Sequence, residues 1–171
     1  SYFDCAGFTS AVGFARDSVR RSEGANGNEE NAMVTYRIIT GDNTGTYVRI
    51  QSNKSPSDYD TDRSAEGKYW NENVSKYVDA SKGHVRWQLL KDDSYNYDSE
   101  TNTPKKYVTR TIYNVKPDRI MHFRRFMHRT AKTGEQRNGD WTRLVFRVVS
   151  GGNRNMFIAA QPFDTFKRGE R

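Results

Sequence analysis

Cysteine and long apolar runs are nearly absent from this chain of 171 residues, and each absence excludes a class of protein. Cys5 is the only cysteine, so no disulfide can close within the chain. We expect Cys5 to be a buried small hydrophobe or an intermolecular partner. No run of about 20 apolar residues occurs, so no membrane-spanning helix is expected. No signal peptide is visible, so Ser1 would be the mature end of a secreted protein.

Sequence motifs for metals and nucleotides are also missing. The three histidines, His84, His122 and His128, have no cysteine partners at metal-ligand spacing. No phosphate-binding loop, nucleophile-elbow serine or dinucleotide fingerprint appears. The sequence therefore predicts no metal and no cofactor.

The composition favours one domain over residues 1–171. Hydrophobic residues make up only 34% of the chain, but aromatic residues reach 13% and supply bulky core material. A domain of about 150 residues buries about 68–70% of its unfolded surface, so a sizeable core is expected. No internal repeat or low-complexity tract marks a boundary.

Two segments alternate apolar and polar side chains, as strands with one buried face do. The first is residues 84–90 and the second is residues 141–149. In the second, aliphatic and aromatic side chains oppose Arg143 and Arg147. A glycine turn and a further apolar strand are expected over residues 150–161.

The rest of the chain predicts an α+β fold, with an N-terminal helix packed on a twisted antiparallel sheet. The helix would begin at Thr9 or Ser10, where a hydroxyl can cap it. The other expected elements are a hairpin from Met33–Thr40 and Thr46–Ser52, a second helix over Lys68–Lys82, and a basic edge hairpin from Lys105–Val115 and Arg119–Met127.

The strand residues resemble the guanyl-specific fungal ribonucleases. The shared order is a Trp-centred strand, a separate strand with arginine before an aliphatic-Val-Phe run, a Gly/Asn turn, and a short apolar strand. The resemblance places Arg86 at the position of the family's catalytic glutamate, and Gln161 at that of its catalytic histidine. Arg143 matches the phosphate-binding arginine. Guanidinium and carboxamide groups transfer no proton, so the resemblance implies a pseudo-ribonuclease that is not an enzyme.

The N-terminus resembles the RNase-like secreted effectors of powdery mildew fungi. The carrying residues are Ser1-Tyr2-Phe3-Asp4-Cys5, followed by the expected helix. Such effectors usually pair this cysteine with a second one, which is absent here. The resemblance implies virulence or avirulence activity and secretion, followed by delivery into the cytoplasm or nucleus of a plant cell. Host RNA, host proteins and an intracellular immune receptor would be the partners, with no membrane or metal.

The charge distribution supports an anionic partner. Residues 105–137 hold ten Lys/Arg against Asp118 and Glu135, a net charge of +8, compared with +7 for the whole chain. Such a local excess is typical of nucleic-acid contact, although a solvated basic surface gives the same pattern. The candidate nucleic-acid-binding residues are Arg86, Arg143, Arg147, Gln161, His84, Arg110, Arg124 and Arg125.

Two alternatives remain open on the sequence. One is an active ribonuclease with a relocated acid and base, using His84 or His122 with Asp92 or Asp93. The other is an interaction module without nucleic acid, whose loop tyrosines Tyr95 and Tyr97 form the interface candidates.

Overall fold

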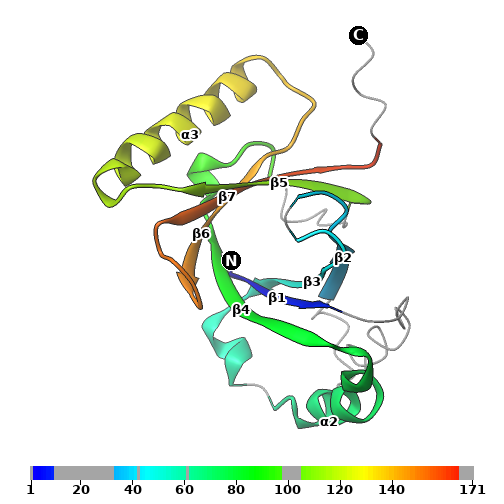
Figure 1. Cartoon of the computed structure of the whole chain (residues 1–171). Coiled ribbons are helices and arrows are strands. Elements are labelled where there is room, and N and C mark those ends of the chain that lie inside the picture. Colours follow the sequence, from blue (N-terminus) through cyan, green and yellow to red (C-terminus); the bar gives the residue numbers. More distant parts are fainter. Residues whose placement is uncertain (1, 10–32, 42, 61, 98–104, 166–171) are drawn as a thin grey trace. The chain divides into compact units, whose positions relative to one another are not determined.

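The computed structural model describes residues 2–9, 33–41, 43–60, 62–97 and 105–165, and its contacts divide the chain into two compact units, Ser1–Arg86 and Trp87–Arg171 (Figure 1). The strands are β1 (Tyr2–Thr9), β2 (Met33–Arg37), β3 (Tyr47–Lys54), β4 (Ala80–Leu89), β5 (Tyr107–Asn114), β6 (Leu144–Ser150) and β7 (Met156–Phe163). The α-helices are α2 (Ser64–Asn73) and α3 (Ile120–Gln136). No helix among these residues is long and apolar enough to cross a membrane.

The first unit contains a sheet in the order β2-β3-β1-β4. β3 is antiparallel to both β2 and β1, so it separates two strands that precede it in the chain. This is the split arrangement of ferredoxin-like modules. The predicted β2–β3 hairpin is confirmed, and its loop places Gly41 and Gly45 at φ of +88° and +90°, which suits glycine.

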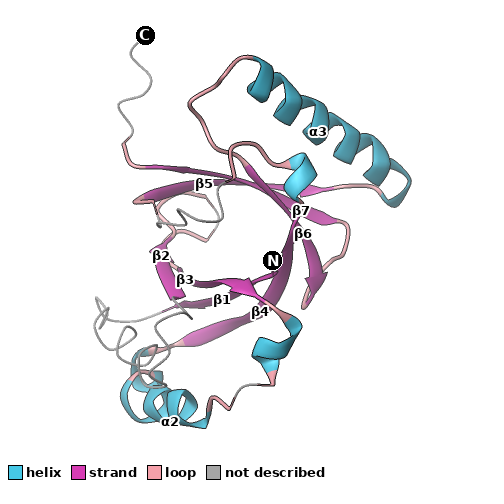
Figure 2. Ribbon diagram, turned by 180° about the vertical axis from the view of Figure 1, so that it is seen from behind, coloured by secondary structure: helices cyan, strands magenta, loops and turns pink. Residues whose placement is uncertain are grey.

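The second unit repeats this pattern. After the end of β4 its strands lie in the order β6-β7-β5, and β7 is antiparallel to both neighbours. α3 joins β5 to β6 and runs along one face of these strands (Figures 1 and 2). The α+β class and the antiparallel pairing are therefore confirmed. The two units are similar in the order of their strands. Similar strand order does not require similar residues, so the sequence shows no repeat.

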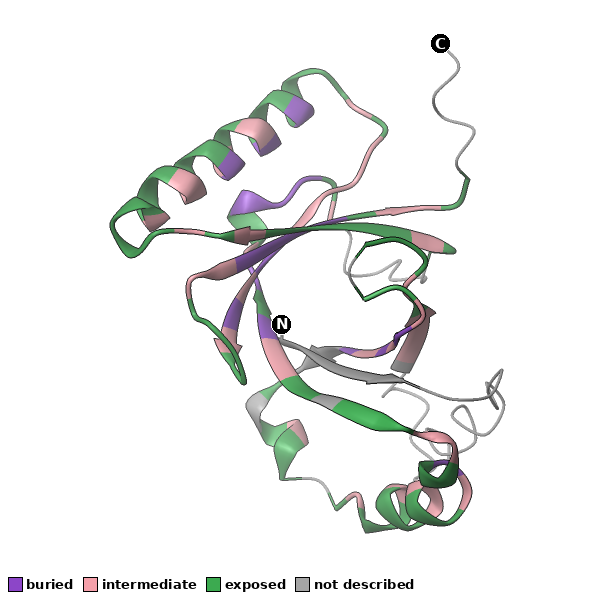
Figure 3. Cartoon of the chain, in the orientation of Figure 1, coloured by how far each residue is buried: buried purple, intermediate pink, exposed green. Residues whose placement is uncertain are grey.

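The core of the second unit lies on both faces of β6 and β7. Figure 3 shows buried segments on α3 and on the strands beside it. Phe157 of β7 is fully buried, and Met127 of α3 is 1% exposed. Phe146 pairs with Ile158 on the other face, while Arg147 pairs with Phe157 on the α3 face. The predicted opposition of apolar residues to Arg143 and Arg147 along this strand is thus confirmed.

The predicted strand Arg119–Met127 is wrong, because these residues begin α3. Met127, Ala131 and Gly134 are buried at helical spacing and face the sheet. When residues at helical spacing are assigned to the two faces of a strand, apolar side chains fall on both faces. This is why the segment resembled an edge strand exposed on both sides.

The second predicted helix is confirmed only in its first part. α2 ends at Asn73, and β4 begins at Ala80, where the sequence pattern predicted helix to Lys82. Gly83, the expected stop, lies inside β4 at φ of +82°. The predicted N-terminal helix, from Thr9 or Ser10 through Arg21, falls almost wholly outside the described part of the chain, and the expected cap Thr9 is the last residue of β1.

Candidate functional site

The α3 face of the second unit presents its side chains in rows across β5, β7 and β6. Tyr113 pairs with Phe157, which pairs with Arg147. The next rows hold Thr111 opposite Ala159 and then Thr109 opposite Gln161. Thr109, Thr111 and Gln161 are exposed, whereas Ala159 and Val145 in the middle of these rows are buried, so the open part of this face lies along the edge strand β5 and the end of β7.

Arg143 borders this open surface. It immediately precedes Leu144, which pairs with Ala160, so Arg143 lies beside Gln161 at one end of two adjacent strands. Its Nη2 donates to the carbonyl oxygen of Met127 in α3 at 3.2 Å, and its guanidinium lies 5.5 Å from the Trp141 ring. The Arg143 guanidinium therefore lies between α3 and the sheet.

The environment of Arg143 is unusual for a cation. Burial lowers the pKa of Arg143, and the nearby Tyr113 phenol opposes part of that shift. The Nε atom is buried and has no hydrogen-bond partner. Among the described residues no carboxylate forms an ion pair with Arg143. A buried donor without an acceptor costs free energy, which a bound anion would recover.

Aromatic rings border the open surface at both ends. Phe123 of α3 lies 5.1 Å from Tyr113 and 4.9 Å from Phe157, between ring centroids. At the other end, Tyr107 of β5 stacks on Phe163 of β7 at 5.5 Å. Flat, weakly polar walls of this kind suit a planar ligand.

Two other polar groups of α3, Arg124 and His128, have protein partners on residues 91–93. Arg124 Nε donates to the buried Asp93 carboxylate at 2.8 Å, and His128 Nδ1 lies 2.7 Å from the Asp92 carbonyl oxygen. Asp93, a candidate base of a relocated ribonuclease site, is thus held in an ion pair. These contacts attach α3 to residues 91–93 and are structural.

The first unit has a polar cluster of a different kind under α2. Arg49 Nη2 donates to Glu66 at 3.4 Å, and Cζ of the same guanidinium lies 4.5 Å from the centroid of the Trp70 ring. Arg63 donates to the buried side chain of Gln51 at 3.0 Å. Because the Glu66 carboxylate forms ion pairs with both arginines of this cluster and no carboxylate pairs with Arg143 among the described residues, an anionic ligand is better supported at Arg143.

The structure brings together some of the sequence-predicted site residues and separates others. Gln161 and Arg143 each lie one residue beyond the Leu144–Ala160 pair, so the register brings them to the same end of β6 and β7. Arg86 belongs to the first unit, where its guanidinium lies 3.7 Å from the centroid of the Tyr59 ring, and His84 is exposed on β4. Arg147 lies on the α3 face and donates to the carbonyl of Arg154, whereas Arg110 lies on the opposite face of β5. On α3, Arg124 pairs with Asp93 and Arg125 is exposed.

The two candidate interface tyrosines are largely covered. Tyr95 is 7% exposed, and its hydroxyl donates to the Gly139 carbonyl at 2.6 Å. Tyr97 is half-buried, with its ring 5.9 Å from Lys91 Nζ and a buried hydroxyl that has no partner. Both side chains therefore fold back toward the second unit.

Sequence reasoning missed Thr109, Thr111 and Trp141 as site residues. The threonines follow Tyr107 at two-residue spacing on one strand face, which was visible in the sequence. The threonines lie next to Gln161 only because of the register between β5 and β7, and a local sequence pattern does not predict that register. Among the described residues no group of three His, Cys, Asp or Glu side chains is placed to hold a metal ion.

Comparison with solved structures identifies the fold. The chain resembles a protein from Lactobacillus acidophilus named as a putative monooxygenase, with a TM-score of 0.59, 14% identity, and coverage of 95% of this chain and 76% of that one. A Fusobacterium nucleatum protein of the same name gives a TM-score of 0.57, 14% identity, and coverage of 96% and 76%. No family model and no curated protein matches the chain.

These likenesses correct two predictions. The ribonuclease-like fold is wrong, because the chain has the fold of the two proteins named as monooxygenases. The prediction of a non-enzymatic pseudo-ribonuclease is wrong with it, since Arg86 and Gln161 were assigned their roles through the ribonuclease fold. The resemblance of residues 1–5 to mildew effectors, with secretion and immune recognition, stays a prediction. The α+β chain thus shares its fold with proteins named as monooxygenases.

Proposed function

We propose that the second unit binds a planar aromatic anion, such as a phenolate, on the open surface beside α3. The supporting observation is Arg143, a half-buried guanidinium without a carboxylate partner among the described residues, whose buried Nε has no hydrogen-bond partner. An anionic oxygen would satisfy this donor and form a charge-assisted hydrogen bond. Arginine is always charged in proteins, so it would favour the ionised form of the ligand.

The neighbouring side chains suit such a ligand. Tyr107 and Tyr113 offer ring faces at the two ends of the surface, while Thr109, Thr111 and Gln161 offer hydrogen-bonding groups on its floor. Ligand sites commonly combine apolar walls with a few placed polar groups. The arrangement therefore favours a ring with polar substituents over an aliphatic acid.

The proposed reaction is insertion of one atom of dioxygen into the ring of this anion, with the second atom leaving as water, so that a phenol and O2 give a quinone and H2O. The names of the two structural neighbours support oxidative chemistry on this fold. A phenolate gives up electrons more readily than the neutral phenol, so a residue that favours ionisation of the ligand would raise the fraction present in the reactive form. Arg143 would bind and orient the reacting oxygen, and the aromatic rings would limit access of water.

Calorimetric titration with nitrophenols and hydroxynaphthoquinones, which ionise near neutral pH, tests the binding. Arg143→Gln should weaken binding by about 10- to 150-fold, the effect of losing about 1.5–3 kcal/mol from a charged hydrogen bond. Arg147→Gln is the matched control, because it removes the same charge from the same strand face. Equal effects of both substitutions would contradict a site at Arg143.

Oxygen uptake tests the reaction separately. The wild-type protein should consume dioxygen with electron-rich compounds of the same class, such as naphthols and dihydroxynaphthalenes, and the Arg143→Gln variant should consume it more slowly at equal occupancy. Binding without oxygen uptake across the panel would refute the oxygenation proposal and leave the ligand site standing.

A further inference from the structure

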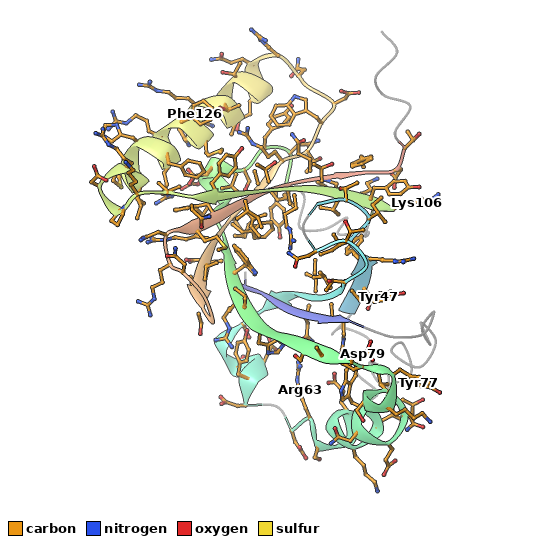
Figure 4. All side chains as sticks on the ribbon, in the orientation of Figure 1. Tyr47, Arg63, Tyr77, Asp79, Lys106 and Phe126 are labelled. Carbon is orange, nitrogen blue, oxygen red and sulfur yellow. The ribbon has the colours of Figure 1, made fainter. Side chains whose placement is uncertain are left out.

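The outer face of α3 is a cationic surface that the proposed reaction does not use. Its centre consists of Arg125 and Arg129, with His122 beside them, and all three are exposed. We call these residues, with Phe126, the α3 ridge. Phe126 is 61% exposed, and Figure 4 labels it on this helix. The only acidic residue of α3, Glu135, forms an ion pair with Lys132 at 2.8 Å, so no carboxylate of the helix neutralises the ridge.

The inner face of α3 is already occupied. Met127, Ala131 and Gly134 are buried, and Arg124 is held by Asp93. The ridge residues take no part in these contacts, so they do not serve to attach the helix. A large exposed aromatic ring flanked by unneutralised cations is therefore a surface feature that needs another explanation.

We propose that the α3 ridge binds single-stranded nucleic acid, with Arg125 and Arg129 contacting phosphates two nucleotides apart and Phe126 stacking on a base. The two arginines are four residues apart, a rise of about 6 Å along the helix. Two stacked nucleotides span about 6.8 Å of one strand at 3.4 Å each, which matches that spacing. An exposed phenyl ring beside a cationic track is the combination that single-strand binding uses.

The distribution of apolar residues disfavours a membrane as the partner. Met121 is 67% exposed, but it lies five residues before Phe126, so the two side chains are about 140° apart around the helix. Arg125 and Arg129 stand between them. A flat lipid surface needs its apolar side chains on one shared stripe, and the apolar stripe of α3 faces the sheet.

Fluorescence anisotropy with a short labelled single-stranded RNA of mixed sequence tests the proposal. Binding should weaken with salt at a log–log slope of about −1.4, the value for two phosphates on a single strand. Arg125→Gln with Arg129→Gln should reduce affinity by about tenfold or more and flatten that slope. Phe126→Ala should reduce affinity by about 5- to 150-fold without changing the slope.

Two controls separate the ridge from net charge and from the Arg143 site. Arg110→Gln with Lys116→Gln removes the same charge from exposed positions in the second unit, and it should leave RNA affinity within about twofold. Arg143→Gln should also leave it unchanged, so failure of the ligand-site proposal would not affect this one. Circular dichroism of each variant should confirm that α3 is retained.

Four outcomes would overturn the proposal. They are an equal loss of affinity in the matched charge variant, an unchanged affinity in the ridge variant, binding to phosphatidylserine vesicles without binding to RNA, and competition by polyglutamate as effective as by unlabelled RNA. The last two would identify a membrane or an acidic protein segment as the partner.

Discussion

The ion pair between Arg124 and Asp93 is the clearest test of the structure at the level of single residues. Asp93 has a side chain only 4% exposed, whereas that of Arg124 is 37% exposed. Arg124→Ala would leave a buried carboxylate without its partner. We expect a loss of about 2–3 kcal/mol in the free energy of unfolding, less than for a fully buried pair because Arg124 is partly solvated.

The neighbouring residue supplies the control for this prediction. Arg125→Ala removes the same charge from the exposed face of α3, and its effect should stay within about 0.5 kcal/mol. Urea denaturation measures both values. Similar effects of the two substitutions would show that Asp93 does not depend on Arg124.

Asp164 makes a second prediction, on pH. Its pKa is lowered first by a hydrogen bond from the Lys105 ammonium at 2.8 Å and second by one from the Lys106 amide. A lowered pKa stabilises the fold above the unfolded value, near 4, and this contribution is lost as the pH falls through the folded value. Lys105→Ala should move the Asp164 pKa upward in an NMR titration, whereas Lys116→Ala should not.

Glycine in α3 offers a test at the level of the element. A Cβ added at Gly134 would come within 2.8 Å of the Trp141 ring and 3.0 Å of the Tyr95 ring. Gly134→Ala should destabilise the protein by about 1–2 kcal/mol, because ring displacement outweighs a helix-propensity gain of about 1 kcal/mol. Thermal unfolding measures the change.

Gly67 in α2 is the control for the Gly134 substitution. A Cβ there meets nothing within 4 Å, so Gly67→Ala should stabilise the protein by about 0.5–1 kcal/mol. Stabilisation by both substitutions would mean that α3 does not pack against Trp141 and Tyr95.

Strands were more predictable than helices in this chain. Alternation over β4 and β6 and the glycines of the two hairpin loops are local signals, so the sequence located these strands to within a few residues. α3 was missed because Ile120–Met127 holds arginines and a histidine among its apolar residues, which allowed both a helical and an extended interpretation. Gly134, buried against aromatic rings, is a helix residue that propensity alone disfavours.

At the scale of the whole molecule, the order of the strands in the sheet could not be predicted from the sequence. The ribonuclease resemblance used local patterns in β4, β6 and β7, and those patterns are compatible with more than one topology. The pairing of β5 with β7 joins residues about 50 positions apart, and it creates the split arrangement found in the second unit. The same pairing places Thr109 beside Gln161, so the candidate site was only half predictable: Arg143 and Gln161 were named, but with roles borrowed from another fold.

A crystal structure of the protein soaked with a nitrophenolate that binds in calorimetry tests the central claim most directly. We predict the ring beside α3, between Tyr107 and Tyr113, with its charged oxygen within hydrogen-bonding distance of the Arg143 guanidinium. A ligand bound elsewhere, or an Arg143 guanidinium paired with a carboxylate of the protein, would contradict the account.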